Sequence, residues 1–180
     1  RFESRGLGDV YKRQLKNSTN VGLEEFEGNE PTLYERLTHR PELEQIFQDA
    51  MEAISVQSNA MLAKFLDLSE VDHLLDVGGG NGTNIIQLAS RYPHLKASVF
   101  DSPTVCSIAQ QNIEQHGLQD RLNAVEGDCF KTDFPDVDCI LFCHFFTIWS
   151  AEDNQRLLKK CFDSLPSGGK VIIFNMMQDD

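Results

Sequence analysis

Hydrophobic residues follow two different rhythms along the chain. Between residues 41 and 68, apolar side chains recur every three or four positions, which predicts a long amphipathic helix that begins at Pro41. One or two helical turns are predicted before it, within residues 32–40. From residue 71 onward, short apolar runs alternate with helical patterns and glycine clusters. Strands separated by helical crossovers form a parallel sheet with helices on both faces, so we predict an α/β fold.

Five predicted strands are short and largely apolar: residues 73–77, 97–100, 122–127, 138–143 and 170–175. The last of them, KVIIFN, is almost continuously apolar, as expected for a strand that is buried on both faces. Helices are predicted after the glycines at 78–82, over residues 104–117 and after residue 150. Gly117 ends the second of these helices, and Ser150 with Asp153 forms a capping box for the third.

The charge of the chain narrows the classes of partner. With 28 acidic and 16 basic side chains in 180 residues, the net charge is −12, which argues against nucleic acids and anionic membranes as partners. The longest apolar stretch, residues 139–149, is too short to span a bilayer. Five cysteines without a Cys-x-x-Cys pair favour buried thiols in a reduced, cytoplasmic setting. Cys139 and Cys143, four positions apart, would fall on the same face of a strand, where a structural role is favoured, so we predict no metal site.

The first fourteen residues do not fit the rest of the chain. Four of them are basic in an otherwise acidic protein, and they show no periodicity and no apolar run of the kind that a secretory signal needs. The segment DVYKRQ at residues 9–14 corresponds to a DNA string that resembles a transposon end used to tag sequencing libraries. We therefore predict that residues 1–14 are adaptor-derived and that the native protein begins near Leu15.

The stretch LLDVGGGNGTN at residues 74–84 carries the most chemistry. A strand ends in Asp76, and glycines follow at alternate positions, which lets the backbone turn sharply and approach a ligand closely. The dinucleotide fingerprint needs its third glycine three positions after the second, where this chain has Thr83. A nicotinamide oxidoreductase is therefore a distant alternative.

Two further acids follow the next two predicted strands. Asp101 lies nineteen residues after Gly82, near the place where nucleotide folds carry an acid that accepts from ribose hydroxyls. Asp128, in EGDCF, is placed to accept from an adenine amino group. Each acid alone is as consistent with a solvated loop carboxylate. Ligands of open α/β sheets bind at the carboxyl ends of the strands, however, so three acids at three such ends favour a binding site.

The segments DVGGGNG, VFDSPTV, EGDCF, IWSAED and LPSGGKVIIFN occur in the order and spacing of the S-adenosylmethionine-dependent class I methyltransferases. More narrowly, they resemble the small-molecule O-methyltransferases of plant phenolic and bacterial antibiotic pathways. The resemblance covers about residues 30–180. It implies a Rossmann-like sheet with its first five strands present, S-adenosylmethionine as cofactor, a small-molecule acceptor, and a homodimer for the full-length protein.

The resemblance also implies roles for segments and residues. It divides the chain into a helical linker and acceptor-pocket segment at 15–70 and a cofactor-binding domain at 71–180 that is incomplete at its C-terminus, so that we expect the chain alone to be inactive. The implied acceptor contacts are Phe47, Met51 and Trp149. For Phe47 and Met51, a place in an ordinary helix core is nearly as plausible as contact with the acceptor. The implied cofactor contacts are Asp76, Gly78, Gly80, Asp101, Ser102, Asp128, Cys129, Phe130 and Cys143.

The chain departs from the family at the catalytic triplet. Members often have His-Asp-Trp there, with the histidine as general base, whereas this chain has Thr147, Ile148 and Trp149. A threonine hydroxyl is too weakly basic for that role near neutral pH. His144 is the nearby imidazole and the alternative base, although a buried structural histidine is the commoner outcome in an apolar run. We therefore expect O-methylation mainly by positioning, with C- or N-methylation, or an inactive cofactor-binding relative, as alternatives.

Overall fold

The computed structural model describes residues 33–37, 40–47 and 61–175, and the chain forms two compact units, Arg1–Asp49 and Ala50–Asp180. In the first unit, α2 (Leu33–Leu37) is followed by helical residues 41–47. In the second unit, residues 61–65 are helical and lead to Leu68, which is fully buried. Both helical stretches fall within the helix predicted for 41–68, and residues 48–60 lie outside the described residues.

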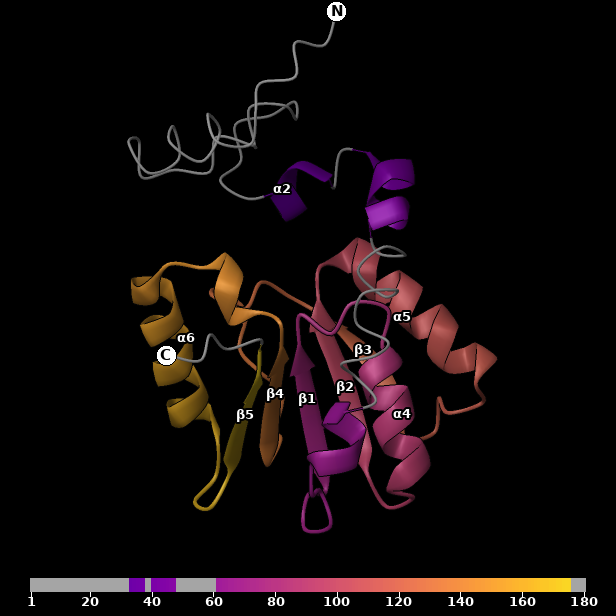
Figure 1. Ribbon diagram of the computed structural model, residues 1–180, viewed down its shortest axis with the longest axis vertical. Helices are drawn as coiled ribbons and strands as arrows, with labels where there is room; N and C mark the ends of the chain where they lie inside the picture. The colour runs from indigo at the N-terminus through magenta and orange to yellow at the C-terminus, as the bar shows by residue number, and fades with distance from the viewer. Residues whose placement is uncertain (1–32, 38–39, 48–60, 176–180) are drawn as a thin grey trace, which may run out of the picture. The chain divides into compact units, whose positions relative to one another are not determined.

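The second unit contains a parallel five-stranded sheet, as predicted, in the order β3-β2-β1-β4-β5 (Figure 1). Strand β1 is therefore central, with β2 and β3 on one side and β4 and β5 on the other. The sequence-based bounds agree with the observed ones to within one residue. The strands are β1 (His73–Val77), β2 (Lys96–Asp101), β3 (Leu122–Glu126), β4 (Cys139–Cys143) and β5 (Lys170–Phe174).

Helices cover both faces of the sheet (Figure 1). Successive strand residues point to opposite faces, so Leu74 joins the core beneath α4 (Thr83–Arg91) and α5 (Pro103–Gln115), whereas Leu75 joins a second core. That second core contains Leu157 and Cys161 of α6 (Ala151–Ser164). The α/β fold predicted from the alternating pattern and the Rossmann-like sheet implied by the resemblance are thereby confirmed. No helix in the described segments is long and apolar enough to cross a lipid bilayer.

The helix ends follow their predicted signals. Gly117 has φ = 66° and its N–H bonds to the carbonyl of Glu114, so it ends α5 in the left-handed conformation that favours glycine. The Ser150 hydroxyl accepts from the N–H of Asp153 at 3.1 Å, and this N-cap begins α6. These ends set the lengths of the crossovers and hence the positions of the strand termini.

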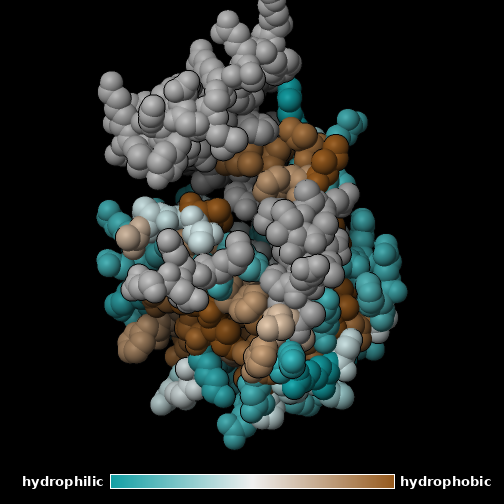
Figure 2. All heavy atoms as spheres, viewed as in Figure 1, coloured by the Kyte–Doolittle hydropathy of each residue, from teal (hydrophilic) through white to brown (hydrophobic). Residues whose placement is uncertain are grey.

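Strand β5 differs from its expectation of burial on both faces. Val171 is 37% and Ile173 43% exposed, and in the described part of the chain β5 pairs with β4 alone. Figure 2 shows apolar side chains gathered over the middle of the viewed face, with hydrophilic residues towards its rim. Continuous apolar sequence identifies β5 as a core strand, but whether both faces are covered depends on neighbouring elements that the strand itself does not specify.

Arg121 joins the end of α4 to the start of β3. Its guanidinium donates to the carbonyls of Ala89 at 3.2 Å, Leu95 at 3.1 Å and Tyr92 at 3.3 Å. Carbonyls at the end of a helix have no partner within the helix, so a cation with several donors is well suited to this position.

We predict that Arg121→Met lowers the free energy of unfolding by about 2–3 kcal/mol, because these carbonyls lose charged donors. Arg121→Lys should fall between the two, since an ammonium cannot reach all three acceptors with the planar fork of arginine. Urea unfolding measures the difference, with Lys96→Met at an exposed strand position as control. Equal stability of Arg121→Met and the native chain would contradict the assignment.

Candidate functional site

The turn after β1 places its backbone where few residue types fit. Gly78, Gly80 and Gly82 have φ values of 72°, 57° and 82°, a left-handed conformation that side chains disfavour. A Cβ atom on Gly78 would also lie 2.4 Å from Cδ2 of Phe145, which follows β4. The turns after β1 and β4 are thus in contact at the point where the strand order reverses. This switch point is the usual ligand site of open α/β sheets.

Asp101 lies at the end of β2 and faces this turn. Its carboxylate accepts from the N–H of Gly80 at 3.2 Å and from the N–H of Ser102, the N-cap residue of α5, at 2.7 Å. Burial raises the pKa of Asp101, although both hydrogen bonds work in the opposite direction. Both oxygens are therefore held in one orientation while retaining lone pairs for further donors.

Asp76, within β1, is fully buried. One carboxyl oxygen, Oδ2, accepts from Nδ2 of Asn84 at 3.2 Å, and the other, Oδ1, has no hydrogen-bond partner among the described residues. Burial raises the pKa of Asp76 to about 7, and the nearby charge of Asp101 adds to the effect. A buried carboxyl with an unmatched oxygen suits a cationic or donor-rich ligand.

Asp128 lies just beyond β3, in a turn that it stabilises itself. Its Oδ1 accepts from the N–H of Phe130 at 2.9 Å, and its Oδ2 pairs with Lys131 at 2.7 Å. Partial burial opposes ionisation, but these hydrogen bonds outweigh it and lower the pKa of Asp128. Lys131 is 81% exposed, so it can give way to a ligand donor at little cost.

Aromatic rings pack together near the turns after β1 and β4. The indole of Trp149 meets the ring of Phe130 edge-on at 4.8 Å and lies 5.8 Å from that of Phe145. The indole N–H of Trp149 is buried and finds no acceptor within the part of the chain that the structure describes. Trp149, predicted as an acceptor contact, thus packs directly against the predicted cofactor residue Phe130.

The cysteines take no chemical role that needs a thiolate. All five lie in the described residues, and none forms a disulfide. Burial raises the pKa of Cys129 to about 12 and raises that of Cys143 strongly as well. Both thiols stay protonated near neutral pH, so neither serves as a nucleophile or a general base there. Across residues 33–37, 40–47 and 61–175, no three potential ligands are grouped to hold a metal ion.

His144 and Thr147 occupy different settings. His144 has φ = 53°, its N–H donates to the carbonyl of Phe174 at 2.8 Å, and its ring meets that of Phe174 edge-on at 5.4 Å. Thr147 lies in an exposed 3-10 helix, η2 (Phe146–Ile148). The histidine is thus anchored at the end of β5, and the threonine is turned to the surface.

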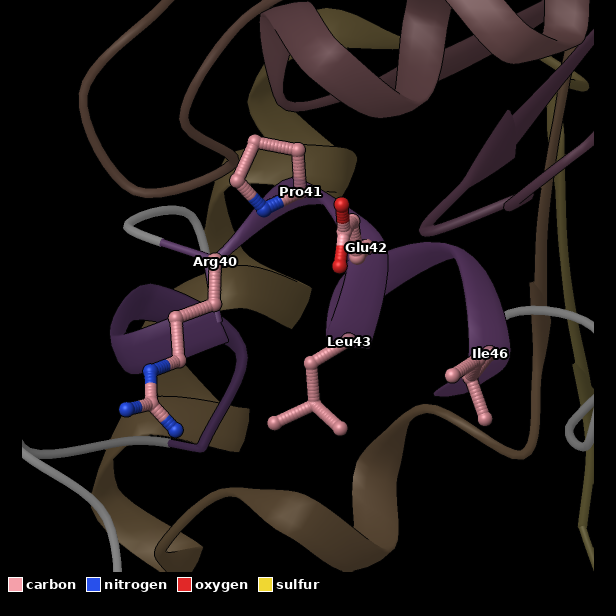
Figure 3. A pocket seen from close by; sticks show the side chains of 5 residues that line it. All are labelled: Arg40, Pro41, Glu42, Leu43 and Ile46. Carbon is pink, nitrogen blue, oxygen red and sulfur yellow. The ribbon is translucent and has the colours of Figure 1, made fainter.

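The two predicted acceptor contacts of the N-terminal helix stay predictions. Phe47 belongs to the first compact unit, and Met51 lies outside the described residues. The first unit has a hollow of its own in which Leu43 and Ile46 project to the same side (Figure 3). That hollow contains none of the predicted site residues. It is lined by Arg40, Pro41, Glu42, Leu43 and Ile46.

Comparison with known proteins identifies the family. The sequence profile of the O-methyltransferase domain matches residues 11–180. The chain belongs to this family. The resemblance inferred from the five short motifs is therefore confirmed, and S-adenosylmethionine, the cofactor that it implied, is the one on which the family depends.

Individual O-methyltransferase relatives differ in what they methylate. The chain is 39% identical to the L-tyrosine C(3)-methyltransferase of Streptomyces lavendulae over 94% of its length and 47% of that protein's. It is 35% identical to the 3-hydroxy-5-methyl-1-naphthoate 3-O-methyltransferase of Streptomyces sahachiroi, over 79% of this chain and 41% of the relative. The crystal structure of the S-adenosylmethionine-dependent methyltransferase SibL superposes with a TM-score of 0.77 at 36% identity, covering 99% of this chain and 53% of SibL. The chain spans about half the length of the relatives it matches.

Two residues that shape this candidate site were not singled out from the sequence. Phe145 closes against Gly78, and Asn84 binds the buried Asp76. Asn84 stands in the quoted glycine segment, eight residues after Asp76, and an amide at that spacing is a usable signal for a partner across a strand-turn-helix unit. Phe145 has no comparable signal, because its contact joins segments 67 positions apart.

The raised pKa of Asp76 predicts a pH-dependent stability. The folded carboxyl keeps its proton up to about pH 7, whereas the unfolded one loses it near 3.8. Folding therefore takes up a proton between these values, and the stability that it provides is complete below pH 4 and is lost as the pH rises towards 7. Asp76→Asn cannot ionise and escapes this loss, so its advantage over the native chain should grow from pH 4 to pH 8 by on the order of 2–4 kcal/mol.

Denaturant unfolding at a series of pH values measures this gap. Asp120→Asn, at an exposed loop position, is the charge-matched control and should show no comparable growth. A gap for Asp76→Asn that stays constant between pH 4 and pH 8 would show that the carboxyl is ionised throughout.

Proposed function

We propose that the protein to which this chain belongs transfers a methyl group from S-adenosylmethionine to a hydroxyl of a small aromatic acceptor. The observation that carries the proposal is the pairing of Asp101 with the glycine turn, where the N–H groups of Gly80 and Ser102 orient its carboxylate. A carboxylate held in this way is suited to accept from two adjacent hydroxyls of a ribose.

The residues around this carboxylate fit the remaining parts of the cofactor. The left-handed glycines leave room beside the backbone for an elongated ligand, and the unmatched oxygen of Asp76 offers an acceptor to a cationic amine. Asp128 adds an acceptor for the adenine amino group, and Cys129 and Phe130 add apolar surface beside it. Cys143, whose thiol stays protonated, packs against the core beneath α4 and α5.

Methyl transfer in this site rests on positioning. S-adenosylmethionine supplies an electrophilic methyl group on a sulfonium, so that a C–O bond forms while the C–S bond breaks and its electron pair stays on sulfur. The chain's part is to hold the acceptor oxygen in line at about 3 Å from that carbon, which alone supplies a large share of the rate enhancement. The exposed hydroxyl of Thr147 takes no proton near neutral pH. A phenol suits such a site, because its proton can leave to water, whereas an alcohol holds its proton much more tightly.

Carbon methylation of a phenolic ring is the second candidate. The 39% identity to a relative named as an L-tyrosine C(3)-methyltransferase favours it. A phenolate is nucleophilic at the ring carbon beside its oxygen as well as at the oxygen itself, so the orientation of the ring in the pocket decides between the two products. Turnover of a panel of phenols, with the methylated atom located by NMR, separates O- from C-methylation and both from an inactive relative.

The homodimer that the family resemblance implies for the full-length protein stays a prediction.

We predict that Asp101→Asn weakens binding of S-adenosylmethionine by about 1.5–3 kcal/mol, because the ribose hydroxyls lose a charged acceptor. Isothermal titration measures the loss, and Asp120→Asn serves as the control with the same change of charge. NAD, tested in parallel, should not bind. Undiminished affinity of Asp101→Asn would remove the ribose assignment.

If positioning dominates, we expect His144→Asn to lower kcat of the whole protein by less than about 10-fold. Asparagine tolerates the left-handed backbone that His144 adopts, so the variant removes the imidazole without straining the turn. A general base would instead contribute on the order of 10²–10⁴-fold. A loss of that size, with the melting temperature unchanged, would make His144 the base and overturn the positioning mechanism.

A further inference from the structure

Lys160, on α6, reaches across to the loop that follows β3. Its Nζ donates to the backbone carbonyl of Cys129 at 2.8 Å and to that of Thr132. The ammonium also lies 4.0 Å from the centre of the ring of Phe134. One side chain thus holds three positions of a single loop, and it comes from a helix about thirty positions later in the sequence.

Lys160 supplies the hydrogen-bond donors for two backbone carbonyls of this loop. Within the loop, the N–H groups of Lys131 and Thr132 bond to the carbonyl of Asp128, and the Thr132 hydroxyl accepts from the N–H of Asp128. These bonds form the turn but leave the carbonyls of Cys129 and Thr132 directed at α6, where Lys160 supplies the donors. An ammonium has three donors on a flexible stem and can satisfy two carbonyls that are not coplanar.

A second contact from α6 supports the same loop. The guanidinium of Arg156 lies 5.6 Å from the centre of the Phe130 ring. The same ring also packs edge-on against the indole of Trp149. The positive charge of Lys160 also acts on Asp128, where it is one of the influences that keep the pKa low against partial burial. Helix α6 therefore fixes the position and favours the ionised form of Asp128.

We infer that Lys160 is a positioning residue for recognition of the adenine base: by holding the carbonyls of Cys129 and Thr132, it sets where the Asp128 carboxylate meets the exocyclic amine. The inference rests on the proposed function, which assigns Asp128 to the adenine. Lys160 itself contacts the loop backbone and the Phe134 ring, so it acts through Asp128.

Its neighbour provides a matched control. Lys159 occupies the preceding position of α6, is 68% exposed, and pairs with Asp163 on the same helix. Lys159→Met and Lys160→Met remove the same charge from the same helix, and only the second removes donors from the loop.

The experiment measures two affinities in the full chain by isothermal titration. S-adenosylhomocysteine carries the adenine amine, and S-inosylhomocysteine carries a carbonyl oxygen in its place. The native chain should bind S-adenosylhomocysteine about 10-fold or more tightly than S-inosylhomocysteine, because the Asp128 carboxylate has no donor to accept from in the second complex. Lys160→Met should bind S-adenosylhomocysteine about 10-fold more weakly and S-inosylhomocysteine almost unchanged, so that the preference collapses. Lys160→Arg should retain most of it, and Lys159→Met all of it.

A role confined to stability would lower the melting temperature and leave the ratio of the two affinities intact. The inference is overturned if Lys160→Met has the same ratio of affinities as the native chain, or if the ratio falls equally in Lys159→Met.

If Lys160→Met does not melt cooperatively, Lys160→Gln takes its place and is judged in the same way. Failure of both variants to fold assigns Lys160 to the fold instead. A native chain that binds neither nucleoside overturns the proposed function, and the inference with it. A native chain that discriminates, beside a Lys160→Met that does so equally, overturns the inference alone.

Discussion

The left-handed backbone of the turn after β1 is the constraint on which the site depends. Three alternate glycines let the chain leave the central strand, pass under the Phe145 ring and enter α4 within a few residues. The same turn presents the N–H of Gly80 to Asp101 on the neighbouring strand. A side chain at Gly78 would be disfavoured by the backbone conformation and would collide with the ring of Phe145, so this position requires glycine on two grounds.

The acids around this turn trade stability for binding. Asp76 is fully buried, and the charge of the half-buried Asp101 lies close enough to raise the pKa of Asp76, an arrangement that costs folding free energy when both ionise. A ligand that brings positive charge and several donors relieves that cost on binding. The site is therefore best matched to a cationic, hydroxyl-rich cofactor, and less well to a polyanionic dinucleotide, which would meet two negative charges.

The proposed methyl transfer relies on geometry rather than on proton transfer. The cysteines are held protonated by burial, Thr147 is exposed, and the ring of His144 packs on Phe174. The rigid parts are the ones that determine where groups lie: the parallel ladder, the aromatic contacts of Trp149, and the clamp from α6 on the loop after β3. A scaffold that acts by orientation can shift from oxygen to carbon or nitrogen when the acceptor is turned, which agrees with the range of relatives it matches.

Local signals in the sequence were enough to predict the sheet and the positions of its three acids. Periodicity and turn residues are local signals, so β1 to β4 and the ends of α5 and α6 followed from short windows, and parallel pairing then brought Asp76, Asp101 and Asp128 to one edge. Tertiary structure alone decided the contacts between distant segments. These are Phe145 against Gly78, Lys160 on the carbonyls of Cys129 and Thr132, and the packing of His144 on Phe174. It also decided the exposure of Val171 and Ile173 and the ionisation of Asp76. Each of these depends on what surrounds a residue in space, and a side chain's neighbours across the fold leave no periodic trace in the sequence around it.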